Sequence, residues 1–95
     1  MQDYELLMII SPELKEEELA SSIEKVSQFI TTRSGVITEL NQWGKRKLAY
    51  PIKRFAEGNY VQTQFKMESH LTKELEANLR ISEEVLRHLL IRSGD

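Results

Sequence analysis

The segment Tyr4–Ile10, with the sequence Y-E-L-L-M-I-I, constrains the fold more than any other part of the chain. It is too short for a free-standing helix and is followed by Ser11-Pro12, so we expect a β-strand. Its apolar side chains alternate between the two faces of that strand, with Leu6, Met8 and Ile10 on one face and Leu7 and Ile9 on the other. A strand that is apolar on both faces is central in its sheet, so the chain is expected to build a sheet around this segment.

Two further segments have the apolar periodicity of amphipathic helices. In the first, which starts after Pro12, the apolar positions recur at helical intervals: Leu19, Ile23, Val26 and Ile30. Acidic residues at Glu16–Glu18 suit the positive end of this helix, and Gly35 is expected to end it. The second helix is marked by Leu71, Leu75 and Leu79. Each helix is expected to bury its apolar face against the sheet.

Three more segments have the composition or alternation of strands. The second strand is expected to cover Val36–Ile52, with Gly44 marking a bulge or bend. Ala56–Asn59 is predicted to be a hairpin turn, from which Tyr60–Met67 returns as the third strand. Val85–Arg92 is predicted to be the last strand.

The predicted order of elements is therefore β-α-β-β-α-β. With right-handed crossovers, this order builds one α+β domain over residues 1–95, in which both helices cover one face of a four-stranded antiparallel sheet. The first and third strands lie in the middle, and the other face of the sheet is open. Alternation assigns these side chains to the open face: Leu7, Ile9, Tyr60, Gln62, Arg87, Leu89 and Ile91. A shift of one residue in the last strand would place His88 and Leu90 there instead.

The segment Trp43–Arg54 is strongly basic. It packs five cations and no acidic residue into twelve positions, although the whole chain has a net charge of −2. The cations alternate with planar or apolar side chains, namely Trp43, Leu48, Tyr50 and Ile52. Such a pattern pairs with phosphates and presents flat surfaces to bases or to a partner protein. The alternative is a solvated edge strand that lysines keep from aggregating.

Length and composition exclude several functional classes. A chain of 95 residues builds one small core and leaves little room for a large enclosed active site. The absence of cysteine excludes disulfide, iron–sulfur and cysteine-based zinc scaffolds. The first residues carry Asp3 and Glu5 where a signal peptide would carry cations, and no apolar run approaches a membrane span of about 20 residues. An intracellular protein without a membrane partner is therefore expected.

Catalytic and cofactor motifs find little support. The two histidines, His70 and His88, have neither cysteine neighbours nor metal-ligand spacing, so no metal site is expected. The glycines form neither a dinucleotide-binding fingerprint nor a phosphate-binding loop, and no serine lies in a nucleophile elbow. The acidic run Glu16–Glu18 is interpreted as a solvated helix face.

The same order of elements occurs in the RNA-recognition motif, in which aromatic residues on the central strands stack on bases. The third strand, Gly58–Phe65, resembles the longer signature of that family only weakly. It lacks the basic residue and glycine at the start and the full aromatic set, so that Tyr60 with Tyr4 would form a small stacking platform. The resemblance to the RNA-recognition motif is therefore weaker than the resemblance described next.

A second resemblance covers nearly the whole chain. It is carried by Tyr4-Glu5, Pro12, W-G-K-R-K-L-A-Y-P-I at Trp43–Ile52, Gly58-Asn59-Tyr60 and Leu79-Arg80-Ile81. In these features the chain resembles the bacterial-type ribosomal protein six family of the small subunit. The segment R-K-L-A-Y-P-I is specific to that family, whereas the topology is shared by many unrelated functions.

The resemblance implies a ferredoxin-like fold and a structural, non-enzymatic role without a cofactor or small-molecule substrate. It implies a heterodimer with small-subunit ribosomal protein eighteen, and binding of the pair to the central domain of the small-subunit ribosomal RNA. It also implies a location on a cytoplasmic bacterial ribosome, or on an organellar ribosome of bacterial type.

These partners can be assigned to residues. We expect RNA to be bound by Lys45, Arg46 and Lys47, and more weakly by Lys53 and Arg54, which lie nearer a turn. The protein partner is expected on the seven open-face side chains named above and on the edge of the last strand. Two alternatives remain: an unrelated ferredoxin-like domain that binds RNA or a regulatory ligand, and a small ferredoxin-like hydrolase. The hydrolase would need a phosphate-cradling loop, for which Ser11-Pro12-Glu13 is poorly suited.

Overall fold

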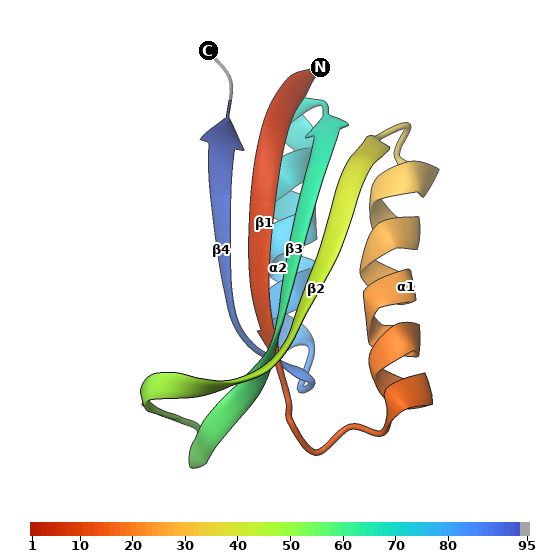
Figure 1. The fold of residues 1–95 in the computed structure, drawn as a ribbon. Helices are drawn as coiled ribbons and strands as arrows, with labels where there is room; N and C mark the ends of the chain where they lie inside the picture. The colour runs from red at the N-terminus through yellow and green to blue at the C-terminus, as the bar shows by residue number, and fades with distance from the viewer. Residues whose placement is uncertain (94–95) are drawn as a thin grey trace.

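The structure, a computed structural model, describes residues 1–93, which form four strands and two helices in the predicted order (Figure 1). The elements are β1 Gln2–Ile10, α1 Glu16–Thr32, β2 Val36–Ile52, β3 Phe55–Met67, α2 Thr72–Ile81 and β4 Val85–Ser93. A short 3₁₀ helix, Ser69–Leu71, precedes α2.

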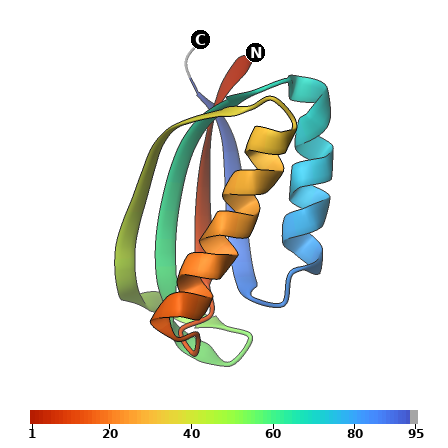
Figure 2. The ribbon, with the colours of Figure 1, turned by 90° about the vertical axis from the view of Figure 1, so that its right-hand side faces the viewer.

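The four strands form one antiparallel sheet in the order β2-β3-β1-β4. β1 lies between β3 and β4, with Leu6 opposite Thr63 on one side and opposite Leu90 on the other. Both helices cover the same face of the sheet (Figure 2). The predicted fold class, the central position of β1 and β3 and the open second face are therefore confirmed.

The main core lies between the helices and the sheet. From β1 it takes Leu6, Met8 and Ile10, each with no measurable exposure, and from the helices it takes these buried side chains: Ile23, Val26, Ile30, Leu75 and Leu79. Both predicted helical stripes are thus confirmed as core positions, although Leu19 is only half-buried and Leu71 lies in the 3₁₀ helix. Within residues 1–93, no helix has the length and hydropathy needed to cross a bilayer.

The end of α1 differs in detail from the prediction. The helix ends at Thr32, and Ser34 rather than Gly35 adopts a left-handed conformation, with φ of 65°. Gly35 donates its N–H to the carbonyl oxygen of Ile30 at 2.9 Å. A Cβ atom at position 35 would lie 2.5 Å from Cγ2 of Ile30, so glycine is needed here for close approach.

The predicted hairpin turn at Ala56–Asn59 is wrong. The turn is Lys53-Arg54, which adopt φ values of 49° and 74°, and Phe55 already pairs with Ile52. A two-residue hairpin loop requires positive φ at one or both of its residues, a requirement that glycine and asparagine usually meet. Gly58-Asn59 suggested a turn for that reason.

Gly58 and Asn59 instead make tertiary contacts within β3. A Cβ atom on Gly58 would lie 2.4 Å from Cγ2 of Ile9, so the side chain of Ile9 occupies the space that another residue would fill. Asn59 is buried and donates from Nδ2 to the carbonyl oxygen of Ser11 at 3.0 Å. Both residues therefore join β3 to the end of β1.

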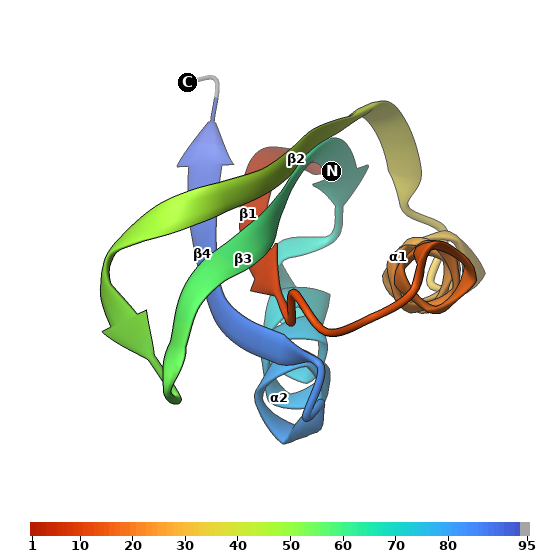
Figure 3. The same cartoon turned by 60° about the horizontal axis from the view of Figure 1, so that its bottom comes forward.

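Residues 45–58 of the β2–β3 hairpin, here termed the arm, extend past the end of β1 and turn toward β4 (Figure 3). The arm covers one end of the face that the helices leave open. There Leu48 forms a second apolar cluster with Ile9 and Leu86, flanked by Ile52, Phe55 and Tyr60. Arg87 of β4 donates to the hydroxyl of Tyr50 at 2.6 Å and adds a polar contact.

Truncation of either helical stripe is expected to destabilise the fold. Ile23→Ala or Leu75→Ala removes buried methyl groups from the main core and is expected to lower the free energy of unfolding by about 2–5 kcal/mol. The measurement is urea denaturation followed by far-UV circular dichroism. Ile81→Ala is the matched control, because Ile81 lies at the end of α2 with 78% of its surface exposed, and its truncation is expected to change stability by less than about 0.5 kcal/mol. Equal stability of all three variants would contradict this core.

Candidate interfaces on the open face and the arm

The seven predicted open-face side chains lie on one face of the sheet. Leu7 is opposite Gln62 on β3 and Leu89 on β4, and directly opposed residues of antiparallel strands point to the same side. In the same way Ile9 is opposite Tyr60 and Arg87, and Ile91 is opposite Glu5. The predicted register of the last strand is therefore confirmed. His88 points to the other face, where it contacts Glu76 of α2 at 3.2 Å.

These side chains differ in accessibility. Leu89 and Ile91 are 53% and 46% exposed, which is high for large apolar residues. Ile9, in contrast, is only 9% exposed because the arm covers it, so its predicted accessibility is wrong. The alternation of side chains along β1 did not indicate that the arm covers Ile9, because the arm comes from a distant part of the chain.

A bulge at the start of β4 adds a residue to the apolar cluster under the arm. The register of β1 against β4 shifts between Ile9 and Ile10, so that Ile10 pairs with Val85 and Ile9 with Arg87. This extra residue lets Val85 join the main core while Leu86 joins the cluster under the arm. This bulge was not predicted from the sequence.

A pocket of about 220 Å³ lies at the junction of the open face and the covered end. It is lined by five of the seven predicted side chains, namely Leu7, Ile9, Tyr60, Arg87 and Leu89, and by β4 at His88, whose side chain points to the other face. The pocket is below the range of about 300–1,000 Å³ that is typical of small-molecule sites. Its size and apolar walls suit a side chain of a partner protein better than a substrate.

Gln62, also predicted for the partner surface, belongs to a polar row across the sheet. Its Nε2 donates to Oε2 of Glu5 at 2.5 Å, and its Oε1 accepts from Nδ2 of Asn41 at 3.2 Å. Asn41 also donates to Glu39 at 2.9 Å. The open face thus has an apolar half near β4 and a polar, acidic half toward β2.

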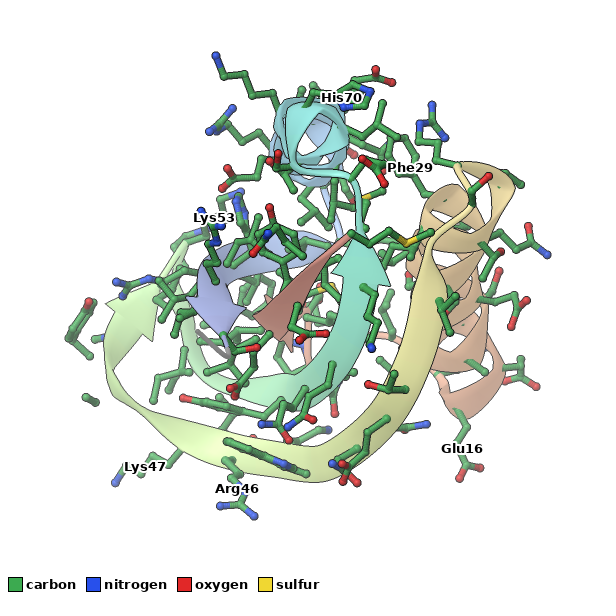
Figure 4. All side chains as sticks on the ribbon, turned by 90° about the horizontal axis from the view of Figure 1, so that it is seen from above. Glu16, Phe29, Arg46, Lys47, Lys53 and His70 are labelled. Carbon is green, nitrogen blue, oxygen red and sulfur yellow. The ribbon has the colours of Figure 1, made fainter. Side chains whose placement is uncertain are left out.

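All five predicted cations are exposed, but they form two groups. Lys45, Arg46 and Lys47 lie on β2, an edge strand, and Figure 4 shows Arg46 and Lys47 pointing outward from it. Lys53 and Arg54 form the turn at the tip of the β2–β3 hairpin, and Figure 4 shows Lys53 apart from Arg46 and Lys47. None of the ion pairs found in residues 1–93 uses these five side chains. Lys47 does lie opposite Glu57 of β3, so its charge is the most locally compensated of the group.

A stack of side chains links the open face to the first group of cations. The rings of Trp43 and Tyr60 are nearly parallel, at 8°, with centroids 6.1 Å apart. The guanidinium carbon of Arg46 lies 5.5 Å from the indole centroid, and its Nε donates to the carbonyl oxygen of Trp43 at 3.4 Å. Tyr4 is not part of this stack, because it is buried against Phe65 on the face that the helices cover.

The bulge predicted at Gly44 makes this stack possible. Gln42 pairs with Val61 and Gly44 with Tyr60, so Trp43 is the extra residue on the bulged strand. Gly44 adopts φ of 87°, a conformation that glycine tolerates. Trp43 was identified from the sequence as part of the basic segment, but its contact with Tyr60 was not predicted. The aromatic residue beside a glycine within a strand was the available signal.

Comparisons with known proteins agree on one family. The sequence model of the family described as Ribosomal protein S6 matches residues 3–92. Two bacterial relatives are each described as "Small ribosomal subunit protein bS6". That of Desulforudis audaxviator is 48% identical over 92 residues, covering 97% of this chain and 98% of the relative. That of Caldanaerobacter subterraneus subsp. tengcongensis is 45% identical over 95 residues, covering both chains fully.

A solved structure agrees with the same assignment. The crystal structure of 30S ribosomal protein S6 from Thermotoga maritima superposes with a TM-score of 0.92 at 35% identity, and covers 97% of this chain and 87% of that one. The similarity therefore extends over the sheet, both helices and the arm.

Substitution of Gly58 tests how the arm is seated on β1. In Gly58→Ala the new methyl group and Cγ2 of Ile9 need the same space, and the free energy of unfolding is expected to fall by about 1–3 kcal/mol. Glu57→Ala, at the neighbouring exposed position, is the control and is expected to stay within about 0.5 kcal/mol of the parent. In an Ile9→Ala background the cost of Gly58→Ala is expected to shrink. Denaturant unfolding of the five proteins (the parent, the three single variants and the double variant) measures these costs, and an unchanged cost of Gly58→Ala in the Ile9→Ala background would contradict the contact.

Proposed function

Because this chain belongs to the ribosomal protein S6 family, we propose that it binds small-subunit ribosomal RNA jointly with ribosomal protein eighteen. The family consists of structural proteins of the small ribosomal subunit and not of enzymes, so the chain is a ribosomal protein. Membership also removes the alternatives of an unrelated ferredoxin-like regulatory domain and of a small hydrolase.

The observation that carries RNA binding is the set of five cations on the arm, which take part in none of the ion pairs found within residues 1–93. Five exposed cations lie within residues 43–54 of a chain whose net charge is −2, so the attraction for a polyanion is local. Lys45 and Arg46 lie on an edge strand, where no neighbouring strand blocks the approach of a phosphate backbone. Neutralising phosphates there releases counterions, which favours binding in a manner that depends on salt and little on sequence.

The protein partner is proposed for the apolar half of the open face. Leu89 and Ile91 are exposed there beside the pocket, and Leu7, Tyr60 and Arg87 line its walls. Among the described residues 1–93, β4 pairs only with β1, so its outer edge presents backbone groups that an extended segment of the partner can bind. Ile9 and Gln62 contribute less, because the arm covers the first and hydrogen bonds occupy the second.

RNA binding is tested by the triple variant Lys45→Ala, Arg46→Ala and Lys47→Ala. The slope of log affinity against log salt is expected to fall in magnitude by about 0.7–0.9 for each lost phosphate contact, with similar weakening for different RNA sequences. Affinity for a transcript of the small-subunit RNA central domain is measured with protein eighteen present. The same experiment on Lys53→Ala with Arg54→Ala is expected to give a smaller change.

The matched control removes the same charges from the helices, with Lys25→Ala, Lys73→Ala and Arg80→Ala. These three cations are exposed on α1 and α2, away from the arm. Equal loss of affinity and slope in both triple variants would mean that net charge, and not the arm, determines RNA binding. An unchanged slope in the arm variant would refute the assignment.

The partner surface is tested by Leu89→Asp. A carboxylate at the centre of the apolar half is expected to abolish the heterodimer with protein eighteen, because removing a charge from water against an apolar partner surface is costly. The isolated chain should remain folded, since Leu89 is exposed, and RNA binding should weaken only through the lost partner. Ile81→Asp, which adds the same charge at an exposed position of α2, is the control. Isothermal titration gives heterodimer affinity and thermal melting gives folding; unchanged affinity would exclude this surface, and an unfolded chain would place Leu89 in the core.

A further inference from the structure

We propose that Trp43 is a nucleobase-binding site, at which an unpaired base of the RNA stacks on the exposed indole. This inference rests on the proposed RNA-binding function and extends it. The cations of the arm recognise phosphates of any RNA, whereas a stacking site requires a bulge, loop or strand end.

The indole is both exposed and held in place. Trp43 is 40% exposed, although tryptophan is usually well buried. Its ring nevertheless packs parallel to Tyr60, and its backbone carbonyl accepts a hydrogen bond from Arg46. Tyr60 is itself half-buried between β1 and the arm, in the cluster with Ile9 and Leu48. A flat side chain that is already ordered loses little conformational entropy when a base stacks on it.

The charges around the indole favour a nucleotide over an apolar side chain of a protein. The guanidinium carbon of Arg46 lies 5.5 Å from the centroid of the indole ring, and the residues on either side of Arg46 along β2, Lys45 and Lys47, are exposed. No acidic residue occurs from Trp43 to Arg54. The phosphate that follows a base stacked on Trp43 would therefore meet cations on the same strand. Each nucleotide carries both a π-face and an anion, which is the combination that this part of β2 matches.

The recognition is expected to select unpaired bases. In an RNA duplex the bases are stacked on one another, and the deep, narrow major groove excludes side chains. A bulged base is free to leave the stack and cover the indole. The contact adds a base-dependent contribution to the affinity without adding a phosphate contact, so it should change affinity and leave the salt slope unchanged.

The experiment uses the full chain and three RNA hairpins of equal stem length. One is fully paired, one carries a single bulged adenosine, and one carries an abasic nucleotide at the bulge. Trp43 is the only tryptophan of the chain, so its fluorescence reports directly on stacking. We expect quenching by the bulged hairpin and little change with the paired or abasic hairpins, while anisotropy of a dye on the RNA measures binding to all three.

Variants separate the ring from the charges. Trp43→Leu is expected to lose at least about fivefold in affinity for the bulged hairpin, with an unchanged salt slope and unchanged affinity for the paired hairpin. Trp43→Phe keeps an aromatic face and should retain most of the preference for the bulge. Val36→Ala is the control, since Val36 is an exposed apolar residue of β2 outside the arm, and it should keep the full preference.

Two outcomes in the parent would overturn the inference: equal affinity for the bulged and abasic hairpins, or unaltered indole fluorescence when anisotropy reports binding. Two outcomes in Trp43→Leu would also overturn it. These are an unchanged preference for the bulged hairpin, or a loss of affinity for protein eighteen with no loss of affinity for RNA. If Trp43→Leu does not fold, the fluorescence of the parent still decides between stacking and its absence. Failure of the proposed function has a different signature. In that case the parent shows no salt-dependent affinity for any hairpin or for the central-domain transcript.

Discussion

The packing of β1 on both of its faces is the contact on which the rest of the structure depends. Toward the helices, Leu6, Met8 and Ile10 form the floor of the main core. Toward the open side, Ile9 enters the space left by Gly58 and meets Leu48 and Leu86. One strand therefore anchors two apolar layers of very different size, and the second layer holds the arm in place.

The small second cluster determines where the cations and the proposed partner surface lie relative to one another. Leu48 is the buried residue of the basic segment, and its burial draws the arm across the end of the open face. The contact between Tyr50 and Arg87 joins the arm to β4, the strand that carries Leu89 and Ile91. Tyr60 lines the pocket and also stacks on Trp43. RNA and a protein partner would thus bind to adjoining surfaces that share one small apolar support.

Prediction from the sequence was most successful where the spacing of apolar residues within one helix or strand indicates which face of that element is buried. Three features were predicted correctly because each follows from the geometry of one element: the apolar stripes of α1 and α2, which include Ile23 and Leu75, the alternation along β3, and the face of β4 on which Leu89 lies. It failed at the hairpin turn. Gly58-Asn59 has turn-forming chemistry, but the two residues serve contacts with Ile9 and Ser11, while Lys53-Arg54 adopt the positive φ values.

The sequence by itself therefore determined the order of elements, the two faces of each strand, the family and the concentration of charge in one segment. Only the tertiary structure decided that Ile9 is covered, that the cations form two groups and that Trp43 stacks on Tyr60. The reason is physical: periodicity records which face of an element is buried, but not which distant segment buries it. The glycine at position 44 did indicate a bulge, but not that Trp43 would contact Tyr60. The path of the arm and the extra residue in β4 change which residues meet across elements, and the local pattern of the sequence did not indicate either of them.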